Sequence, residues 1–230
     1  MMTIDAKGME LKQANAEIRE ALEKEGTATV KNANDSYGLG SGLGSGTLKF
    51  KGDVGDYTGM VNNGAEIIVE GSARNFLGDN MISGKISLAG DSGYGAGMYC
   101  YGGTIHVKGS AGDFTATMNK GATIIIGGDV GHDVGTYMVK GDLIIGGNAG
   151  KNLGNYIIRG TIFLGGEAES LGSNMKVEPL NDEEKARLKK LLAKGGFDID
   201  PVNLKKYVPL TDKPFYTAKV EAKTISIEED

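Results

Sequence analysis

Apolar residues recur along most of the chain with a step of 19 residues. One apolar column consists of Leu48, Ile67, Ile86, Ile105, Ile124, Leu143 and Ile162. A second column, two residues later, consists of Phe50, Val69, Leu88, Val107, Ile126, Ile145 and Leu164. Side chains at positions i and i+2 share one face of a β-strand. The pattern therefore predicts one short strand per repeat, with both columns facing a common core.

Glycines follow the same step and make up 38 of the 230 residues, more than twice the typical share of about 7%. Most repeats contain the spacing G-x-x-G-x-x-x-G. We expect the first glycine of each repeat to supply positive φ and close backbone approach at a corner. These structural glycines are Gly52, Gly71, Gly90, Gly109, Gly128, Gly147 and Gly166.

A fixed period near 20 residues is typical of a solenoid. The sequence predicts an all-β fold, a right-handed single-stranded parallel β-helix of seven to eight 19-residue coils over residues 27–173. A left-handed hexapeptide helix needs an apolar residue at every sixth position, and that series fails here at the third step. The G-G-x-G-x-D unit of calcium-binding nonapeptide repeats does not occur in the chain.

The two ends of the solenoid depart from the repeat. Residues 1–26 predict a capping helix, with apolar residues at helical spacing and Gly26 as its stop. Within residues 174–230, Asn181 and Glu184 resemble a capping box that begins a helix ending near Lys194. The last 30 residues indicate an extended tail that docks on a partner or packs on its own domain.

Three groups of residues are candidates for an interaction surface. Ile125, Ile144 and Phe163 form an outward apolar column, which marks an interface unless the helix after residue 181 covers it. Tyr99, Tyr137 and Tyr156 stack with Met118 in a turn column. That column is a binding platform or a ladder that only stabilises the fold. Phe215 and Tyr216 add aromatic side chains to the tail.

Candidate chemistry is sparse in this sequence. His106 and His132 each occupy an outward or turn position without a second histidine, so both are expected to be exposed and non-catalytic. Cys100, the single cysteine, is expected to be structural. The tandem glycine motifs have no intervening helices, which a dinucleotide-binding site requires. The sequence therefore predicts no catalytic, cofactor-binding or metal-binding residue in this chain.

The overall charge excludes some partners. A net charge of −5 and a pI near 5.2 argue against nucleic acid or an anionic membrane as the main partner. No apolar run approaches the roughly 18 residues of a membrane span, and no signal peptide opens the chain. We expect a cytoplasmic protein.

The glycine-rich coils, the helical segment from Met9 to Glu25 and the first strand at residues 30–32 resemble the C-terminal β-helix domain of glutamate synthase large subunits. The free-standing form of this domain, found in glutamate-synthase-like and N-methylglutamate synthase complexes, is the most similar. The segment from Gly195 to Tyr207 looks like the ending of that subunit. A related β-helix forms the C subunit of formylmethanofuran dehydrogenase. The coils alone therefore do not distinguish a subunit of a glutamate-synthase-like complex from a subunit of that enzyme.

The resemblance implies a non-catalytic scaffold subunit. It would hold a glutaminase-type amidotransferase subunit beside a glutamate-synthase-like subunit that binds FMN and an iron–sulfur cluster. The catalytic cysteine, flavin ligands and cluster ligands of the family belong to those other chains, so none carries over here. Two alternatives are the equivalent subunit of a formylmethanofuran dehydrogenase and, from a different class, a polysaccharide-active β-helix enzyme.

Overall fold

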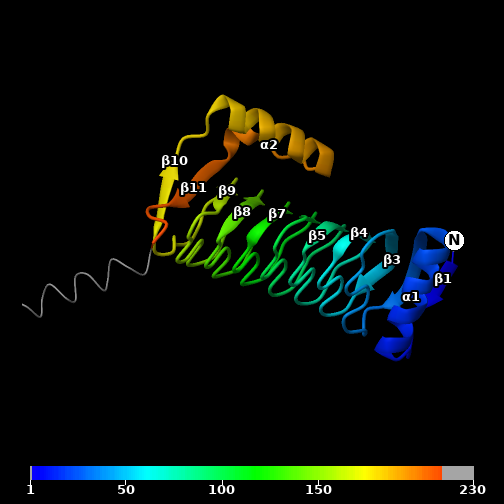
Figure 1. Ribbon diagram of the computed structural model, residues 1–230. Helices are drawn as coiled ribbons and strands as arrows, with labels where there is room; N and C mark the ends of the chain where they lie inside the picture. Colours follow the sequence, from blue (N-terminus) through cyan, green and yellow to red (C-terminus); the bar gives the residue numbers. More distant parts are fainter. Residues whose placement is uncertain (1, 214–230) are drawn as a thin grey trace, which may run out of the picture.

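The computed structural model describes residues 2–213, which form a rod of stacked coils with one helix at its N-terminal end and a second helix alongside its C-terminal half (Figure 1). Phe215 and Tyr216 lie outside the described residues. The parallel strands of the rod are β2 (Thr27–Ala33), β3 (Thr47–Val54), β4 (Asn63–Val69), β5 (Ser83–Leu88), β6 (Thr104–Val107), β7 (Lys120–Ile126), β8 (Lys140–Ile145) and β9 (Thr161–Leu164). The predicted parallel β-solenoid, of about seven turns, is confirmed.

The register is the one that the 19-residue step predicts. Ile67 lies opposite Leu48 on one neighbouring strand and opposite Ile86 on the other. Both apolar columns are almost completely excluded from solvent. Burying one such side chain stabilises the fold by about 1.5–3 kcal/mol, so the stacked columns are the main source of cohesion.

The corner glycines serve mainly for close approach, and the expectation of positive φ is wrong for all of them except Gly52, with φ +88°. A Cβ atom on Gly109 would collide with the Asp91 carboxylate of the preceding coil. That carboxylate accepts a hydrogen bond from the Ser110 backbone N–H at 2.7 Å. Equivalent links recur between every pair of adjacent coils from Asp53 to Glu167. The glycine column thus leaves room for a ladder of side-chain-to-backbone hydrogen bonds.

Positive φ occurs instead at three alternate residues in the turn segment of most coils. In the coil after β4 these are Phe76, Gly78 and Asn80. A Cβ atom on Gly78 would lie 2.7 Å from Cδ1 of Ile105, inside the core. The middle position therefore requires a small residue for packing as well as for φ, whereas the flanking positions accept larger side chains.

The N-terminal end of the rod is closed by β1 (Met2–Asp5) and α1 (Leu11–Glu25). The predicted capping helix is present and ends at Gly26, which has φ +70°. Strand β1, which the sequence pattern did not indicate, pairs in parallel with β2. The buried Asn15 side chain of α1 donates to the Gly38 carbonyl and accepts from the Gly40 N–H, which ties the helix to the first coil.

The C-terminal segment folds back over the rod. It comprises β10 (Met175–Glu178), α2 (Asp182–Gly195), a short 3₁₀ helix (Pro201–Asn203) and β11 (Lys205–Pro209). The capping box at Asn181 and Glu184 is confirmed. β11 pairs antiparallel with both β9 and β10, so the expected extended tail is a sheet strand as far as Pro209. This antiparallel pair covers the last edge of the parallel stack.

We predict that Gly109→Ala lowers the free energy of unfolding by about 2 kcal/mol, because the new methyl group displaces the Asp91 carboxylate from the hydrogen-bond ladder. The matched control is Gly44→Ala, where an added Cβ meets no atom within 4 Å and φ is not positive. Urea unfolding of both variants measures the difference. Equal stability of the two variants would contradict the steric role of the corner glycine.

Candidate functional site

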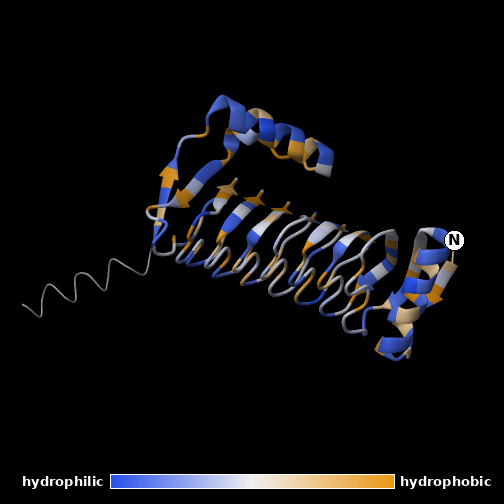
Figure 2. Ribbon diagram, viewed as in Figure 1, coloured by the Kyte–Doolittle hydropathy of each residue, from blue (hydrophilic) through white to orange (hydrophobic). Residues whose placement is uncertain are grey.

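The outward apolar column is an internal packing surface. Ile125, Ile144 and Phe163 are each 0% exposed, so the expectation of an exposed interface at these residues is wrong. They form a second core with residues of the C-terminal segment: Leu188, Leu192, Phe197 and Leu204. Figure 2 shows hydrophobic positions on β7, β8 and β9 on the side of the rod that faces α2. The alternative, in which the helix covers the column, is the one observed.

His106 continues this column and is also buried, which corrects the expectation of an exposed imidazole. Its side chain is 5% exposed and makes an edge contact with the Phe197 ring at 5.4 Å between centroids. Burial lowers the pKa of His106 to about 4, and the charges of Lys85, Lys108 and Lys194 contribute to the shift. Its Nε2 atom has no hydrogen-bond partner within residues 2–213. His106 is therefore neutral at physiological pH.

Lys108 joins the rod to the end of α2. Its Nζ donates to the Gly195 carbonyl at 2.6 Å and to the Gly196 carbonyl, and it lies 3.9 Å from the Phe197 ring centroid. A cation at the C-terminus of a helix is favourable because the terminal carbonyls carry partial negative charge. Lys108 thus has a structural role at the end of α2.

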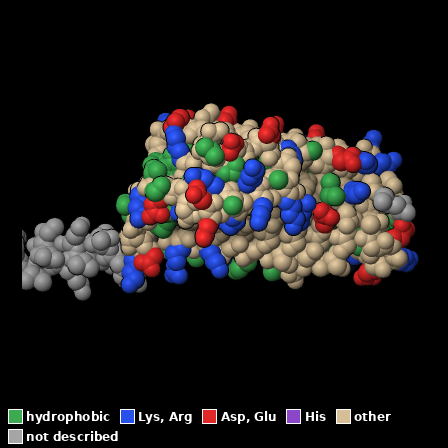
Figure 3. Space-filling view, turned by 90° about the horizontal axis from the view of Figure 1, so that it is seen from above, with side chains coloured by type: hydrophobic (Ala, Val, Ile, Leu, Met, Phe, Trp, Pro, Cys, Tyr) green, Lys and Arg blue, Asp and Glu red, His purple; other side chains and the backbone are tan. Residues whose placement is uncertain are grey.

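Seen from above in Figure 3, side chains of both charge signs are spread over this face of the molecule.

His132 and Cys100 both have structural roles: His132 accepts a hydrogen bond from the next coil, and Cys100 lies in the core. His132 is exposed, as expected, and its Nδ1 accepts a hydrogen bond from the Lys151 backbone N–H at 2.8 Å. It belongs to a second hydrogen-bond ladder, which also includes Asp56, Asn75 and Asp113. Cys100 is fully buried, and burial raises the pKa of its thiol to about 12. Such a thiol is not a nucleophile at neutral pH.

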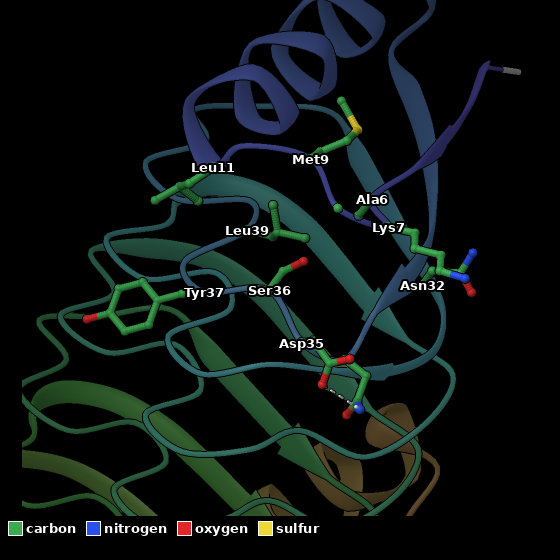
Figure 4. Close-up of a pocket in the computed structure, with 11 residues that line it drawn as sticks. Ala6, Lys7, Met9, Leu11, Asn32, Asp35, Ser36, Tyr37 and Leu39 are labelled. Atoms are coloured by element: carbon green, nitrogen blue, oxygen red, sulfur yellow. Dashed lines mark hydrogen bonds between the residues drawn. The ribbon is translucent and has the colours of Figure 1, made fainter.

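A cavity of about 480 Å³ lies at the N-terminal end of the rod between α1 and the first coil (Figure 4). Its lining includes Lys7, Asn32, Asp35, Ser36, Tyr37 and Leu39. The Asp35 carboxylate is paired with Arg74 at 3.0 Å and accepts from the Asn34 side chain. In the described part of the chain, no group of three or more His, Cys, Asp or Glu side chains is placed to hold a metal ion. The Asp35 carboxylate is thus already engaged by two neighbouring side chains.

Two aromatic columns run along the turns. Tyr99, Met118, Tyr137 and Tyr156 all have positive φ, and the Tyr137 and Tyr156 rings stack at 5.6 Å. Sequence reasoning missed the other column, which comprises Tyr37, Tyr57, Phe76, Tyr94 and Phe114. Tyr57, Phe76 and Phe114 share the 19-residue step, but Tyr37 and Tyr94 are one residue out of register. That offset hides the continuity of the ladder from a column alignment.

A family model described as the GXGXG motif matches residues 6–194. The chain belongs to this family, that of the glutamate synthase C-terminal domain. The match spans α1, all the coils and nearly all of α2. No curated protein matches the chain. Neither described helix is long and apolar enough to cross a membrane.

We predict that acid destabilises this GXGXG protein partly through His106. The unfolded chain binds a proton at this residue below pH about 6.5, whereas the folded chain resists protonation down to about pH 4. The free energy of unfolding should therefore fall across that window, by roughly 3 kcal/mol from this residue. His106→Leu should remove this component, and His132→Asn, which keeps an acceptor, should retain it. Thermal unfolding at a series of pH values measures how steeply the free energy of unfolding falls with pH in each variant. The same pH dependence in both variants would show that His106 does not cause the loss of stability.

We also predict that Phe163→Ala costs about 3–5 kcal/mol of stability, because it opens a cavity beneath α2. Val177→Ala is the control, since Val177 is 60% exposed and should cost little. Urea unfolding distinguishes the two. Unchanged stability in Phe163→Ala would show that α2 does not hold this surface in solution.

Proposed function

We propose that the chain is a non-catalytic scaffold subunit of a glutamate-synthase-like complex. In this role it holds a glutaminase-type amidotransferase subunit beside a subunit that binds FMN and an iron–sulfur cluster. The observation that carries the proposal is the family match over residues 6–194. The cofactors are expected in the partner subunits, because the catalytic and cofactor ligands implied by the sequence resemblance belong to other chains of such complexes.

The state of the reactive side chains supports a structural role. His106 is buried and neutral, His132 accepts a backbone hydrogen bond, and the Cys100 thiol is buried with a raised pKa. Asp91 and its equivalents accept backbone N–H groups in the corner ladder. These groups stabilise the stack of coils rather than converge on a substrate.

The shape of the rod also suits a scaffold. Coils that repeat at about 4.8 Å build a rigid surface roughly 34 Å long over seven turns. Each coil contacts its neighbours through strand pairing and side-chain ladders, so positions far apart along the rod keep a constant separation. Two enzymes docked on such a surface would hold a constant distance for the transfer of ammonia.

The test is a tagged pull-down of the full chain from extract of its source organism, with mass spectrometry and a flavin absorbance scan. We expect a glutaminase-type chain and a yellow flavoprotein that contains iron. The two proteins should be lost when the tag is carried by the destabilised Phe163→Ala variant and retained with Val177→Ala. Recovery of molybdenum or tungsten proteins would replace the proposal with the formylmethanofuran dehydrogenase role. Turnover of acidic glycans by the isolated chain would replace it with an enzyme.

A further inference from the structure

Three cations follow one another on successive coils along one edge of the rod. Lys120 lies opposite Lys140 in the register of β7 and β8. Arg159 takes the place of Lys140 on the next coil: the Lys140 backbone N–H donates to the Asn119 carbonyl, and the Arg159 N–H donates to the Met138 carbonyl. Coils repeat at about 4.8 Å, so the three positions span roughly 10 Å of the rod. We call Lys120, Lys140 and Arg159 the cation strip.

The charges of the cation strip are not balanced within residues 2–213. Lys140 and Arg159 are exposed, Lys120 is half-buried, and none of the three forms an ion pair with a described carboxylate. The nearby Asp142 is paired instead with Arg187 of α2. Like charges on adjacent strands repel one another and destabilise the sheet. The strip therefore presents three positive charges that the described residues leave without an acidic partner.

Another pair of stacked lysines shows how the rod balances such charges elsewhere. Lys31 lies opposite Lys51 in the register of β2 and β3. Each of these lysines has an acid on its other side: Lys31 pairs with Asp5 at 3.1 Å, and Lys51 pairs with Glu70 at 2.6 Å. No described acid plays this part for the cation strip. Its counter-charges are therefore expected from outside the described fold.

Exposed apolar side chains border the cation strip. The Lys120 Nζ lies 4.0 Å from the ring centroid of Tyr101 and 5.8 Å from that of Tyr99. An aromatic face attracts an ammonium group through its quadrupole but leaves the net positive charge in place. Tyr101 is 55% exposed, and Ile82, at the equivalent place one coil earlier, is 43% exposed. A complementary ligand therefore carries carboxylates beside an apolar side chain.

We propose that the cation strip, bordered by Tyr101, is the docking site for an acidic segment of a partner protein. About three or four residues of an extended chain span the strip. Lysine and arginine donate charge-assisted hydrogen bonds to the carboxylates of such a segment. A protein partner is favoured over nucleic acid because the basic surface is short and the chain carries a net charge of −5. The identity of the partner as a complex subunit rests on the scaffold role proposed above.

The experiment uses the full chain with ¹³C-labelled lysine and tyrosine side chains and the peptide Ac-Glu-Glu-Leu-Glu-Glu-NH₂ as the probe. The neutral peptide Ac-Gln-Gln-Leu-Gln-Gln-NH₂ is the matched ligand control. We expect the side-chain resonances of Lys120, Lys140 and Tyr101 to shift with the glutamate peptide and to stay in place with the glutamine peptide. The dissociation constant should be on the order of millimolar at low ionic strength. It should rise as salt is added, because salt screens exposed charges.

Two charge-matched double variants complete the design. Lys140→Gln combined with Arg159→Gln should weaken binding of the glutamate peptide by roughly fivefold or more. Both side chains are exposed, so these substitutions should leave the fold intact. The control combines Lys12→Gln with Lys151→Gln, which changes the net charge equally but at exposed lysines on α1 and on the turn that contains the His132 contact. The control should keep the affinity of the unaltered chain.

Absence of shifts with the glutamate peptide, equal shifts with the glutamine peptide, or equal weakening in both double variants would overturn the site. A single-stranded oligonucleotide that shifts the same resonances and displaces the peptide would assign the strip to nucleic acid instead. Shifts caused by neutralising Glu228, Glu229 and Asp230 in the absence of peptide would assign it to the chain's own acidic residues, and the partner proposal would fail. Because the peptide assay needs no partner subunit, its outcome is independent of whether the scaffold complex is recovered.

Discussion

Every part of this rod depends on the parallel stacking of like positions. From β3 to β9 each paired strand residue faces the residue 19 or 20 positions away on the neighbouring coil, so each side chain must tolerate its own equivalent as a neighbour. Apolar columns satisfy that requirement by packing in the core. Polar columns satisfy it when a side chain accepts a hydrogen bond from the next coil, as Asp91 does from Ser110.

Stacking also explains how the glycines are used. At the corners, glycine leaves space for the carboxylate or hydroxyl of the coil before it, as at Gly109. In the turns, glycine is required where both positive φ and a crowded core coincide, as at Gly78. Ala116 occupies the equivalent position in one coil with φ +60°, so an added methyl group is accommodated there. Space, rather than backbone freedom alone, selects glycine in this fold.

The open ends of a solenoid would expose unpaired strands, and this chain closes both. β1 and α1 cover the first coil, and the antiparallel β11 covers the last parallel strand. The same C-terminal segment also places α2 on the outward apolar column, which removes that surface from contact with other molecules. The two aromatic ladders lie elsewhere, along the turns of the coils.

The repeat period, the strand positions, the core columns, both helices and the capping box at Asn181 followed from the sequence, because each depends on contacts that are local or recur every 19 residues. Only the tertiary structure decided that α2 folds back, that His106 is buried and that β11 joins the sheet. Lys108 contacts Gly195 across 87 residues, and such a single long-range contact leaves no periodic signal in the chain. The role of each corner glycine was likewise hidden, since close approach between coils is a property of the assembled stack and not of one residue's conformation.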